Sequence, residues 1–519
     1  MPSRHSPHVR AILRALLAAS LLAIGGCSSL PPGSGFARTP SVALEHPEAT
    51  RLGGLFLDRV QTEGGKSGFR IIPAGSDGLH IRLQMIHAAE RTIDLQYFIF
   101  HGDDTGRQLT AAIVEAADRG VRVRILIDDA ETQEGDEPIA RLAFHASIEL
   151  RVFNPLRYRG HWGSLRTIEF VLDASRLDYR MHNKLLVVDN AVALLGGRNI
   201  GDEYFQGNPE AQFADDDVLA VGPVVPQLSA TFDEYWRSKL AIPARALSRE
   251  PSPPTGEPPL HGDAQTDPLA GILSRRLPLF WARAQVICDS PEKRDTEEGR
   301  QVGRLMQRPL LARMRATRGE LILVTPYLVP GAEGMALLHD LREQKTRLRI
   351  LTNSLESSTQ LLAQAVYSRY RLPLLLDGVE LSEIRSLLGN SHGSGQGAAM
   401  SRFGNYSLHA KMFVFDRKSV FLGSMNFDER SLHLNTEVGL IIESPEMARQ
   451  VASRFEAMTQ EENAYSLLLR PGRRGGEARL AWRTREGGRP VETGTEPARN
   501  AWQRFLAGLL SILPVDDEL

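Results

Sequence analysis

Two stretches of nine residues carry most of the information in this sequence: MHNKLLVVD at residues 181–189 and LHAKMFVFD at residues 408–416. Both contain the pattern H-x-K-x-x-x-x-D, and in both the aspartate is followed by six residues and then by GGRN (196–199) or GSMN (423–426). The two histidines are 409 − 182 = 227 residues apart. One such pattern is weak evidence, but two with the same downstream spacing indicate that a whole domain has been duplicated.

The segments in front of the two patterns also repeat. A strand, a helix and a second strand are predicted at 92–100, 105–118 and 121–127, and again at 321–329, 334–342 and 347–352. Alternation of this kind is typical of α/β proteins. We therefore predict two tandem α/β domains, each a mixed sheet flanked by helices. A pseudo-twofold axis would relate them, and they would share one active site.

The rest of the chain is divided around these two copies. The predicted parts are a lipoprotein-type signal (1–27), a tether and packing segment (28–78), the first domain (79–243), a Pro-rich linker (244–268), the second domain (269–470) and a breaker-rich tail (471–519). The linker contains PSPPTGEPP, which can form neither a helix nor a sheet ladder. The tail ends in an amphipathic helix, which we expect to dock on the protein rather than on a membrane surface.

Cys27 has a distinctive setting near the N-terminus. Three arginines precede an apolar run at 15–24, and Ile-Gly-Gly-Cys follows it. A basic segment before a short apolar run indicates an export signal, and the run is too short for a bilayer-spanning helix of about 20 residues. The ending resembles a bacterial lipoprotein signal, which implies lipidation of Cys27 and a membrane-anchored protein on the periplasmic face of the cell envelope. Ser28 favours the outer membrane. The alternative is an uncleaved anchoring N-terminus.

The overall charge is close to balanced. The chain has 61 Lys and Arg against 63 Asp and Glu, a formal net charge of −2, which speaks against binding nucleic acid through bulk charge. Cys27 and Cys288 are the only cysteines, so no disulfide framework supports the fold. No Cys/His cluster or carboxylate set has metal-ligand spacing. We therefore expect neither a metal nor another cofactor.

Each motif places an imidazole and an ammonium group on one face of a strand, because side chains two residues apart point the same way. The aspartate that ends each motif stands where a turn is expected. The candidate catalytic residues are His182, Lys184, Asp189, His409, Lys411 and Asp416.

The glycine- and asparagine-containing segments supply candidate phosphate-binding groups. Gly197 and Ser424 would let the backbone approach a ligand, while Asn199 and Asn426 offer amide donors. Two such sets around one phosphorus atom can catalyse phosphodiester chemistry. The lysines would neutralise the anion, one neutral histidine would attack, and the other would protonate the leaving alcohol.

Each imidazole also needs an acceptor for its second nitrogen. Glu437 stands at the start of an apolar strand after the second motif, and Asp217 stands similarly after the first. We predict that these two carboxylates orient the histidines. Asp215 and Asp216 are alternatives to Asp217, and a solvated turn is the structural alternative for all three.

The duplicated motifs resemble the phospholipase D superfamily over about residues 79–470. The segments GGRNIGDEYF (196–205), FDERS (427–431) and SILPV (511–515) resemble the C-type family of bacterial cardiolipin synthases. The resemblance implies phospholipase D-like domains and a phosphohistidine intermediate, with His182 as the nucleophile and His409 as the acid/base. It also implies transfer of a phosphatidyl group, from phosphatidylethanolamine, to phosphatidylglycerol. The partners would then be phospholipids in a membrane and not nucleic acid.

Three other functions fit part of the pattern. The same chemistry could end on water and give phosphatidic acid, or it could act on nucleic acid, which the charge balance disfavours. The third is an inactive lipoprotein that only binds lipid or envelope components. The intact histidine and lysine of both motifs argue against this last function.

Overall fold

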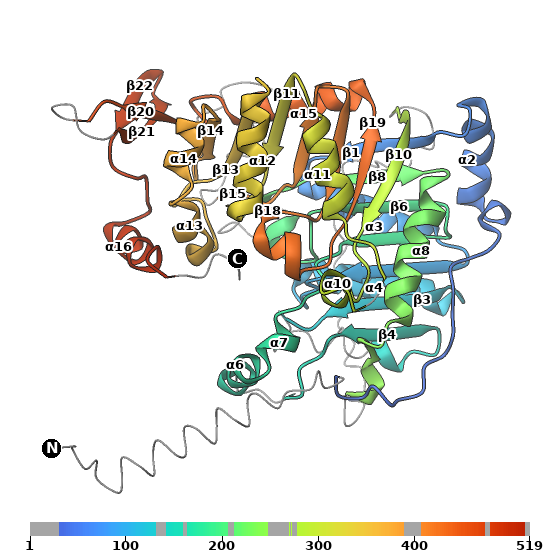
Figure 1. The fold of residues 1–519 in the computed structure, drawn as a ribbon. Coiled ribbons are helices and arrows are strands. Elements are labelled where there is room, and N and C mark those ends of the chain that lie inside the picture. Colours follow the sequence, from blue (N-terminus) through green and yellow to red (C-terminus); the bar gives the residue numbers. More distant parts are fainter. Residues whose placement is uncertain are drawn as a thin grey trace, which may run out of the picture.

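A computed structural model (Figure 1) shows how the two copies are arranged. The structure describes residues 31–130, 142–158, 163–205, 212–247, 269, 271, 278–300, 302–388, 406–472 and 478–513. The predicted signal with Cys27, and all but the first few residues of the predicted linker, lie outside these residues.

One row of hydrogen-bonded strands runs through both halves. The first half contributes, in spatial order, β9 (Ala241–Pro243), β4 (Ile148–Phe153), β3 (Arg122–Asp128), β2 (Thr92–Tyr97), β5 (Leu185–Val188), β6 (Val192–Gly196), β8 (Asp217–Val221) and β1 (Ser67–Ile72). The second half continues with β10 (Phe280–Cys288), β19 (Val438–Glu443), β17 (Ser419–Gly423), β16 (Met412–Phe415), β11 (Glu320–Val324), β13 (Arg347–Asn353), β14 (Glu380–Ile384), β20 (Ala464–Arg470), β21 (Arg479–Glu486) and β22 (Arg489–Thr493). Strands β1 and β10 join the two halves.

The strand order outward from this junction is the same in both halves. In each half, three parallel strands, β2–β3–β4 or β11–β13–β14, are followed toward the junction by antiparallel ones. The two motifs lead into equivalent strands, β5 and β16, which pair with β2 and β11. The prediction of two mixed α/β units is confirmed.

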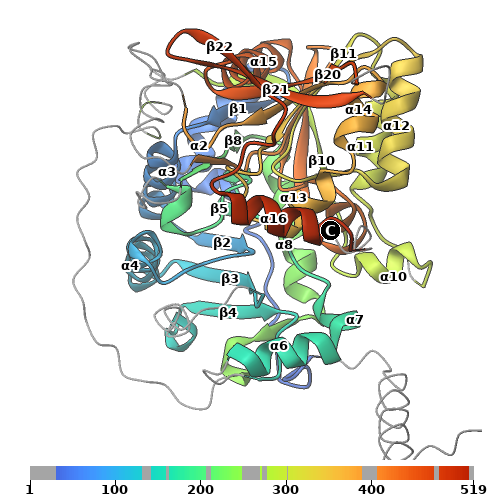
Figure 2. The same ribbon diagram turned by 90° about the vertical axis from the view of Figure 1, so that its left-hand side faces the viewer.

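Helices cover the sheets, as Figures 1 and 2 show. The helices are α2 (Arg51–Thr62), α3 (Gly75–Ala88), α4 (Asp104–Asp118), α6 (Gly163–Leu172), α7 (Ala174–Leu177), α8 (Val224–Arg237), α10 (Lys293–Glu297), α11 (Gln307–Ala316), α12 (Gly331–Glu343), α13 (Leu361–Tyr367), α14 (Arg371–Leu376), α15 (Pro445–Met458) and α16 (Ala501–Leu510). Short 3₁₀ segments are η1 (Pro47–Ala49), η3 (Leu142–Phe144), η4 (Asp202–Tyr204) and η5 (Ala244–Ala246), and η6 (Arg430–Leu434) is a π-helix.

The largest apolar core is shared by both halves. It combines residues of β5, β6, β8 and α8 with residues of β16, β17, β19 and α15, for example Phe232 and Phe455. A second core packs α3 and α4 on the other face of the first sheet, and a third packs α11 and α12 on the second sheet. The motif strands are therefore buried on both faces, which explains their continuous apolar sequence.

The structure differs from the expected elements in two places. The strand predicted at 321–329 is split into β11 and β12 (Leu328–Val329), with Pro326, which has no N–H to donate to a ladder, between them. The breaker-rich tail contains the hairpin β21–β22, anchored by the buried Trp482, whose Nε1 donates to Glu383 at 2.9 Å. Glycines at 487 and 488, both with positive φ, form its turn.

The aspartate that ends each motif holds a turn and not a substrate. The Asp189 carboxylate accepts the backbone N–H groups of Glu90, Arg91 and Thr92 at 2.8–3.0 Å. Asp416 accepts the three equivalent N–H groups of residues 318–320 at 2.6–3.2 Å. A whole strand separates each aspartate from its histidine. The prediction that Asp189 and Asp416 are catalytic is therefore corrected: they fix the start of β2 and β11.

Replacing Asp189 should accordingly cost stability. Asp189→Ala removes an acceptor from three N–H groups and places alanine at φ 51°. We expect the free energy of unfolding to fall by about 3 kcal/mol, from lost hydrogen bonds and backbone strain. Asp189→Asn, which keeps an acceptor oxygen and tolerates this φ, should lose less. Urea unfolding curves measure both, and unchanged stability in Asp189→Ala would contradict the turn-holding role.

Candidate active site

Each motif histidine is hydrogen-bonded to the backbone of the opposite half. The His182 N–H donates to the Thr436 carbonyl at 2.9 Å, next to a parallel bridge between Met181 and Thr436. The His409 N–H donates to the Ala214 carbonyl at 2.7 Å, where β15 (Tyr406–Leu408) pairs with β7 (Gln212–Ala214). The two halves thus exchange main-chain contacts at both histidines.

The side chains cross between the halves in the same way. Nδ1 of His182 lies 2.9 Å from both carboxylate oxygens of Glu437, and Nδ1 of His409 lies 2.6 Å from Oδ2 of Asp215. Both imidazoles are more than nine-tenths buried. Because a carboxylate holds each Nδ1, the nitrogen left for chemistry is Nε2 in both rings.

The expectation that Asp217 orients a histidine is corrected. Its Oδ2 lies 2.8 Å from Arg82 Nη1 and 3.0 Å from Arg198 Nη1, in a fully buried cluster. The two guanidinium groups lower the pKa of Asp217 against the opposing effect of burial. Asp215, weighed as an alternative from the sequence, contacts the imidazole instead. The third aspartate, Asp216, faces Arg454 at 3.2 Å.

The strand registers explain why Asp215, and not Asp217 two residues later, is the partner of His409. Gly196 of β6 pairs with Asp217, whereas Gly423 of β17 pairs with Gly439. Asp217 is therefore equivalent to Gly439, and Asp215 is equivalent to Glu437. Residues two apart on a strand share a face, so the apolar pattern alone did not separate Asp215 from Asp217.

Two predicted phosphate-binding residues serve the carboxylates instead. The Ser424 hydroxyl donates to Glu437. A Cβ at Gly197 would lie 2.2 Å from Oδ1 of Asp215. Gly197 therefore makes room for the Asp215 carboxylate and Ser424 supports that of Glu437, which corrects the expectation that they approach a ligand.

The two asparagines are in different situations. Asn199 accepts the Ile99 N–H at 3.2 Å and donates to the Tyr204 hydroxyl at 2.9 Å, so it is engaged within its own half. In Asn426 the amide oxygen is buried and has no hydrogen-bond partner among the described residues. Unlike that of Asn199, the Asn426 amide nitrogen donates to no other described residue, so it is the better candidate to donate to a phosphate.

The two lysines complete the site. Lys184 Nζ donates to the His182 carbonyl at 2.6 Å, and Lys411 donates to the His409 carbonyl while its Nζ lies 3.0 Å from His409 Nδ1. Both ammonium groups are buried. Burial lowers the pKa of Lys411 to about 8, although Asp215 and Glu437 oppose this shift. Burial likewise lowers the pKa of Lys184.

The pKa values of the histidines and of their carboxylate partners are shifted in opposite directions. Burial raises the pKa of Asp215 and of Glu437 to about 7. Burial and the ammonium groups of both lysines lower the pKa of His182 and of His409 well below the usual range. Each imidazole responds to the lysine of the other half, so the four groups form one electrostatic unit. An anion entering here would favour the protonated imidazole.

Two further residues hold the motifs in place and were not identified from the sequence. Asp128, at the end of β3, accepts the Met181 N–H at 2.9 Å. Asn353, at the end of β13, accepts the Leu408 N–H at 2.8 Å. The residue preceding each motif histidine is thus fixed by an equivalent acceptor. These two residues are 353 − 128 = 225 positions apart, the same offset as between the flanking strands, and this repeat spacing could have identified them from the sequence.

Aromatic rings enclose the imidazoles. Phe98 lies against His182, and Tyr204 and Phe213 lie against His409, all with ring centroids 5.2 Å apart. The Phe98 ring also lies 5.2 Å from the Lys184 ammonium. These rings exclude water from the site, which strengthens its electrostatic interactions.

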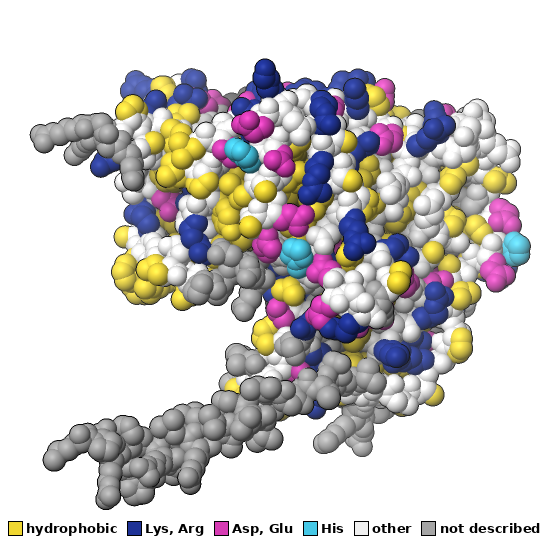
Figure 3. Space-filling model, in the orientation of Figure 1, with side chains coloured by type: hydrophobic (Ala, Val, Ile, Leu, Met, Phe, Trp, Pro, Cys, Tyr) yellow, Lys and Arg dark blue, Asp and Glu magenta, His cyan; other side chains and the backbone are white. Residues whose placement is uncertain are grey.

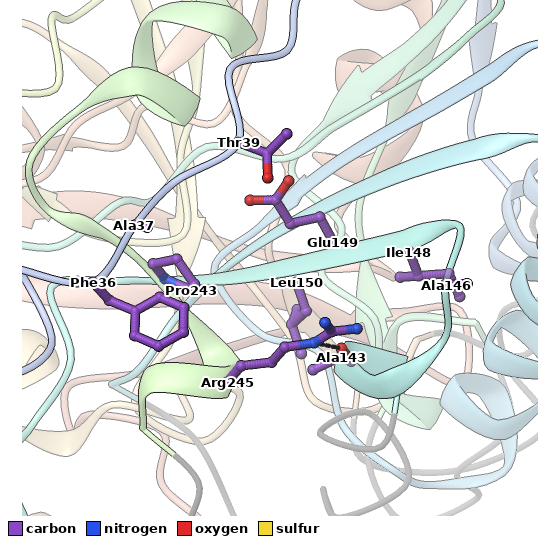
Figure 4. Close-up of a pocket in the computed structure, with 10 residues that line it drawn as sticks. All are labelled: Phe36, Ala37, Thr39, Ala143, Ala146, Ile148, Glu149, Leu150, Pro243 and Arg245. Atoms are coloured by element: carbon purple, nitrogen blue, oxygen red, sulfur yellow. Dashed lines mark hydrogen bonds between the residues drawn. The ribbon is translucent and has the colours of Figure 1, made fainter.

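A separate pocket lies elsewhere in the first half, between the N-terminal segment, β4 and η5 (Figure 4). Its only charged lining side chains are Glu149 and Arg245, and Arg245 donates to the Ala143 carbonyl at 2.5 Å. None of the motif residues lines this pocket, so it is separate from the histidine site.

The described residues contain no group of three or more His, Cys, Asp or Glu side chains arranged to hold a metal ion. Within the same part of the chain, every helix is too short or too polar to cross a bilayer.

Comparison with known proteins agrees with this geometry. The family model described as "Cardiolipin synthase, PLD-like domain" matches residues 83–236 and 310–459. Cardiolipin synthase C of Escherichia coli (strain K12) is 36% identical over 482 residues, which cover 90% of this chain and 99% of that protein. Probable cardiolipin synthase YwiE of Bacillus subtilis (strain 168) is 24% identical, covering 77% of this chain and 68% of that protein.

Among solved structures, the phosphatidylserine synthase of Haemophilus influenzae Rd KW20 is similar in fold, with a TM-score of 0.51 and 12% identity. The match covers 79% of this chain and 91% of that one. The family match covers more than half of the chain, and it includes both histidines. The chain therefore belongs to the phospholipase D superfamily, and within it to the cardiolipin synthase-like phosphatidyltransferases.

Proposed function

We propose that this protein makes cardiolipin by moving a phosphatidyl group to phosphatidylglycerol through a phosphohistidine intermediate. The observation that carries the proposal is the pair of imidazoles, each held at Nδ1 by a carboxylate of the other half and accompanied by two buried lysines. Relatives named cardiolipin synthases support this choice of lipid substrate.

In the first half-reaction, Nε2 of His182 attacks the phosphorus of the donor, for which we propose phosphatidylethanolamine. A nitrogen–phosphorus bond forms and the bond from phosphorus to the ethanolamine oxygen breaks. Protonated His409 gives its proton to that oxygen, and ethanolamine leaves. The Lys184 and Lys411 ammonium groups stabilise the charge on the phosphoryl oxygens, with the Asn426 amide as a further donor.

In the second half-reaction, a hydroxyl of phosphatidylglycerol attacks the same phosphorus. His409 takes the hydroxyl proton, the nitrogen–phosphorus bond breaks, and cardiolipin is released with both histidines restored. Water in place of this hydroxyl would give phosphatidic acid, so exclusion of water by the aromatic rings favours transfer. Together with a lipidated Cys27, this chemistry would operate on the periplasmic face of a membrane.

Loss of either histidine should abolish turnover. With phosphatidylethanolamine and phosphatidylglycerol as substrates, we expect mass spectrometry to detect cardiolipin and free ethanolamine from the wild-type protein. His182→Ala and His409→Ala should each lower the rate by at least about 10³-fold, because the two groups act as a unit. A protein-bound phosphatidyl group, trapped by alkaline denaturation, should be absent from His182→Ala.

His339→Ala, which alters an exposed histidine far from either motif, serves as the control and should keep its activity. Substantial activity in either motif variant would rule out the shared-site mechanism. Phosphatidic acid as the sole product would instead establish the hydrolase.

Substitutions of Asp215 and Asp217 should affect different properties, the first mainly activity and the second mainly stability. Asp215→Asn removes the charge that holds His409 and should lower kcat by at least about 100-fold with little change in unfolding. Asp217→Asn leaves Arg82 and Arg198 buried without a full counter-charge, and should lower the free energy of unfolding by about 3 kcal/mol. Paired measurements of kcat and urea unfolding distinguish them. The reverse pattern would restore Asp217 as the orienting residue.

The alkaline side of the pH profile should report on Lys411. Its ammonium group is charged below a pKa of about 8, so positive charge at the phosphate is lost, and kcat/KM should fall, as pH rises through that value. In Lys411→Arg the charge persists, and the fall should move to higher pH even if the maximal rate is lower. The control is Lys418→Arg, at an exposed lysine in the turn after β16, and it should leave the pH profile unchanged. An identical alkaline limb in Lys411→Arg would assign it to another group.

A further inference from the structure

The C-terminal helix α16 exposes a row of large apolar side chains. Trp502, Phe505 and Leu509 lie on one face and are 65%, 59% and 55% exposed. Ile512, 77% exposed, and Leu513 extend the row. The opposite face, with Ala507 and Leu510, packs against the segment around α13. The helix therefore docks on the protein through one face only, and the expectation of protein docking leaves its wider apolar face unexplained.

The charged side chains of the segment that forms this helix are basic. Residues 498–513 contain no Asp or Glu but include Arg499 and Arg504, which donate to the carbonyl groups of Glu356 and Glu496. Asp516, Asp517 and Glu518 follow this segment in the sequence. Arg369, from the neighbouring segment, donates to the Leu513 carbonyl at 3.2 Å and is exposed. Guanidinium groups beside exposed Trp, Phe and Leu side chains complement a layer of anionic headgroups above hydrocarbon.

A second exposed apolar helix lies on the same side of the molecule. In α6, Ile168 and Leu172 lie four residues apart on one face and are 52% and 77% exposed, whereas Phe170, 37% exposed, lies on another side of the helix. The one acidic residue of this helix, Glu169, is turned inward and accepts the backbone N–H groups of residues 157 and 158 at 2.6 and 2.8 Å. Figure 1 shows α6 and α16 on one side, and Figure 2, which looks onto that side, shows both in front.

This side is also where the catalytic histidines lie. Helix α6 follows the carboxyl end of β4. His182 lies at the carboxyl end of β2, which is parallel to β4 and separated from it by β3, because Gln96 pairs with Leu185. In the second half, α13, which carries α16, follows β13, and His409 lies beside the end of β11, where Val324 pairs with Met412. The space-filling view is hollowed on this side, and hydrophobic side chains gather beside the hollow (Figure 3).

We propose that α16 and α6, one from each half, dock the protein on the surface of an anionic phospholipid bilayer. The apolar faces would enter the boundary between headgroups and acyl chains, and the arginines would contact the phosphates. Headgroups would then meet the edge of the sheet that holds both histidines. The inference rests on the proposed function only for the identity of the lipid that reacts, since docking itself requires no turnover.

Fluorescence quenching of the full chain tests this surface. Vesicles of phosphatidylglycerol and phosphatidylcholine with brominated acyl chains should quench the exposed Trp502, and quenching should weaken with phosphatidylcholine alone. Trp502→Phe should remove most of the quenching when both proteins also carry Trp162→Phe, which removes the tryptophan that directly precedes α6 in the sequence. Of the remaining tryptophans, Trp236 and Trp482 are buried and Trp281 is half-buried. Anchoring through the N-terminus would be the same in both proteins and leaves this difference intact.

A matched pair of variants completes the design. Phe505→Asp with Leu509→Asp, in protein that keeps Trp502, should lower the quenching several-fold. The control is Leu55→Asp with Leu57→Asp, which changes two residues that are 46% and 45% exposed on α2, a helix that lies away from α16 in Figure 1. This control should leave the quenching unchanged. Equal quenching of the Trp162→Phe protein with and without Trp502→Phe would overturn the proposal. So would a dimer in lipid-free buffer that Phe505→Asp with Leu509→Asp dissociates, which would assign this face to a second copy.

These readouts separate the inference from the function on which it draws. Trp502-dependent quenching in a protein that turns over no phospholipid would support docking and refute the phosphatidyltransferase. Turnover without Trp502-dependent quenching would support the phosphatidyltransferase and refute docking through α16.

Discussion

The exchange of backbone hydrogen bonds between the two halves is the constraint on which the site depends. Thr436 accepts the N–H of His182, and Ala214 accepts that of His409, so each motif is fixed by the chain that follows the other motif's strand pair. The carboxylates cross by the same route, because Glu437 and Asp215 are the residues next to these acceptors. Neither half alone contains a histidine with its carboxylate. A single copy of this domain would therefore leave a buried imidazole without its acceptor and a buried carboxylate without its donor, which is costly.

Burial at this interface also sets the protonation of the site. Desolvation raises the pKa of each carboxyl group and lowers that of each imidazole, so burial disfavours the charged form of both members of each pair. The buried lysines add positive charge, which burial disfavours and which the carboxylates stabilise. An anion at this site would further stabilise both ammonium groups and would favour protonation of an imidazole.

Much of this could be predicted from the sequence, because the duplication repeats at fixed spacing. The mixed α/β units follow from that repetition and are present in the structure. Periodicity specifies the face on which a side chain lies, but not which of two same-face residues reaches a partner in the other half. This is why Asp217 was preferred to Asp215. Motif membership was equally misleading for Asp189 and Asp416, whose role depends on the N–H groups at residues 90–92 and 318–320, distant in sequence. The hairpin β21–β22 was not predicted, because the glycines and prolines of residues 471–497 indicate a breaker-rich tail while two of the glycines form a hairpin turn.

Comparison of equivalent positions in the two halves distinguishes residues that the site requires from residues that only fill the core. At the histidine, the lysine, the turn aspartate and the carboxylate partner, both halves have the same chemical groups in the same register. At the equivalent positions of Arg198 and Asp217, the second half has Met425 and Gly439, and the ring of Phe421 fills the space beside Gly439. A buried ion cluster in one half is thus replaced by apolar packing in the other, an exchange that is often neutral for stability. The groups that are repeated are those around the two histidines, and the groups that differ face the outer cores. The symmetry retained by this protein is therefore that of one shared site, and the remainder of each half has been free to diverge around it.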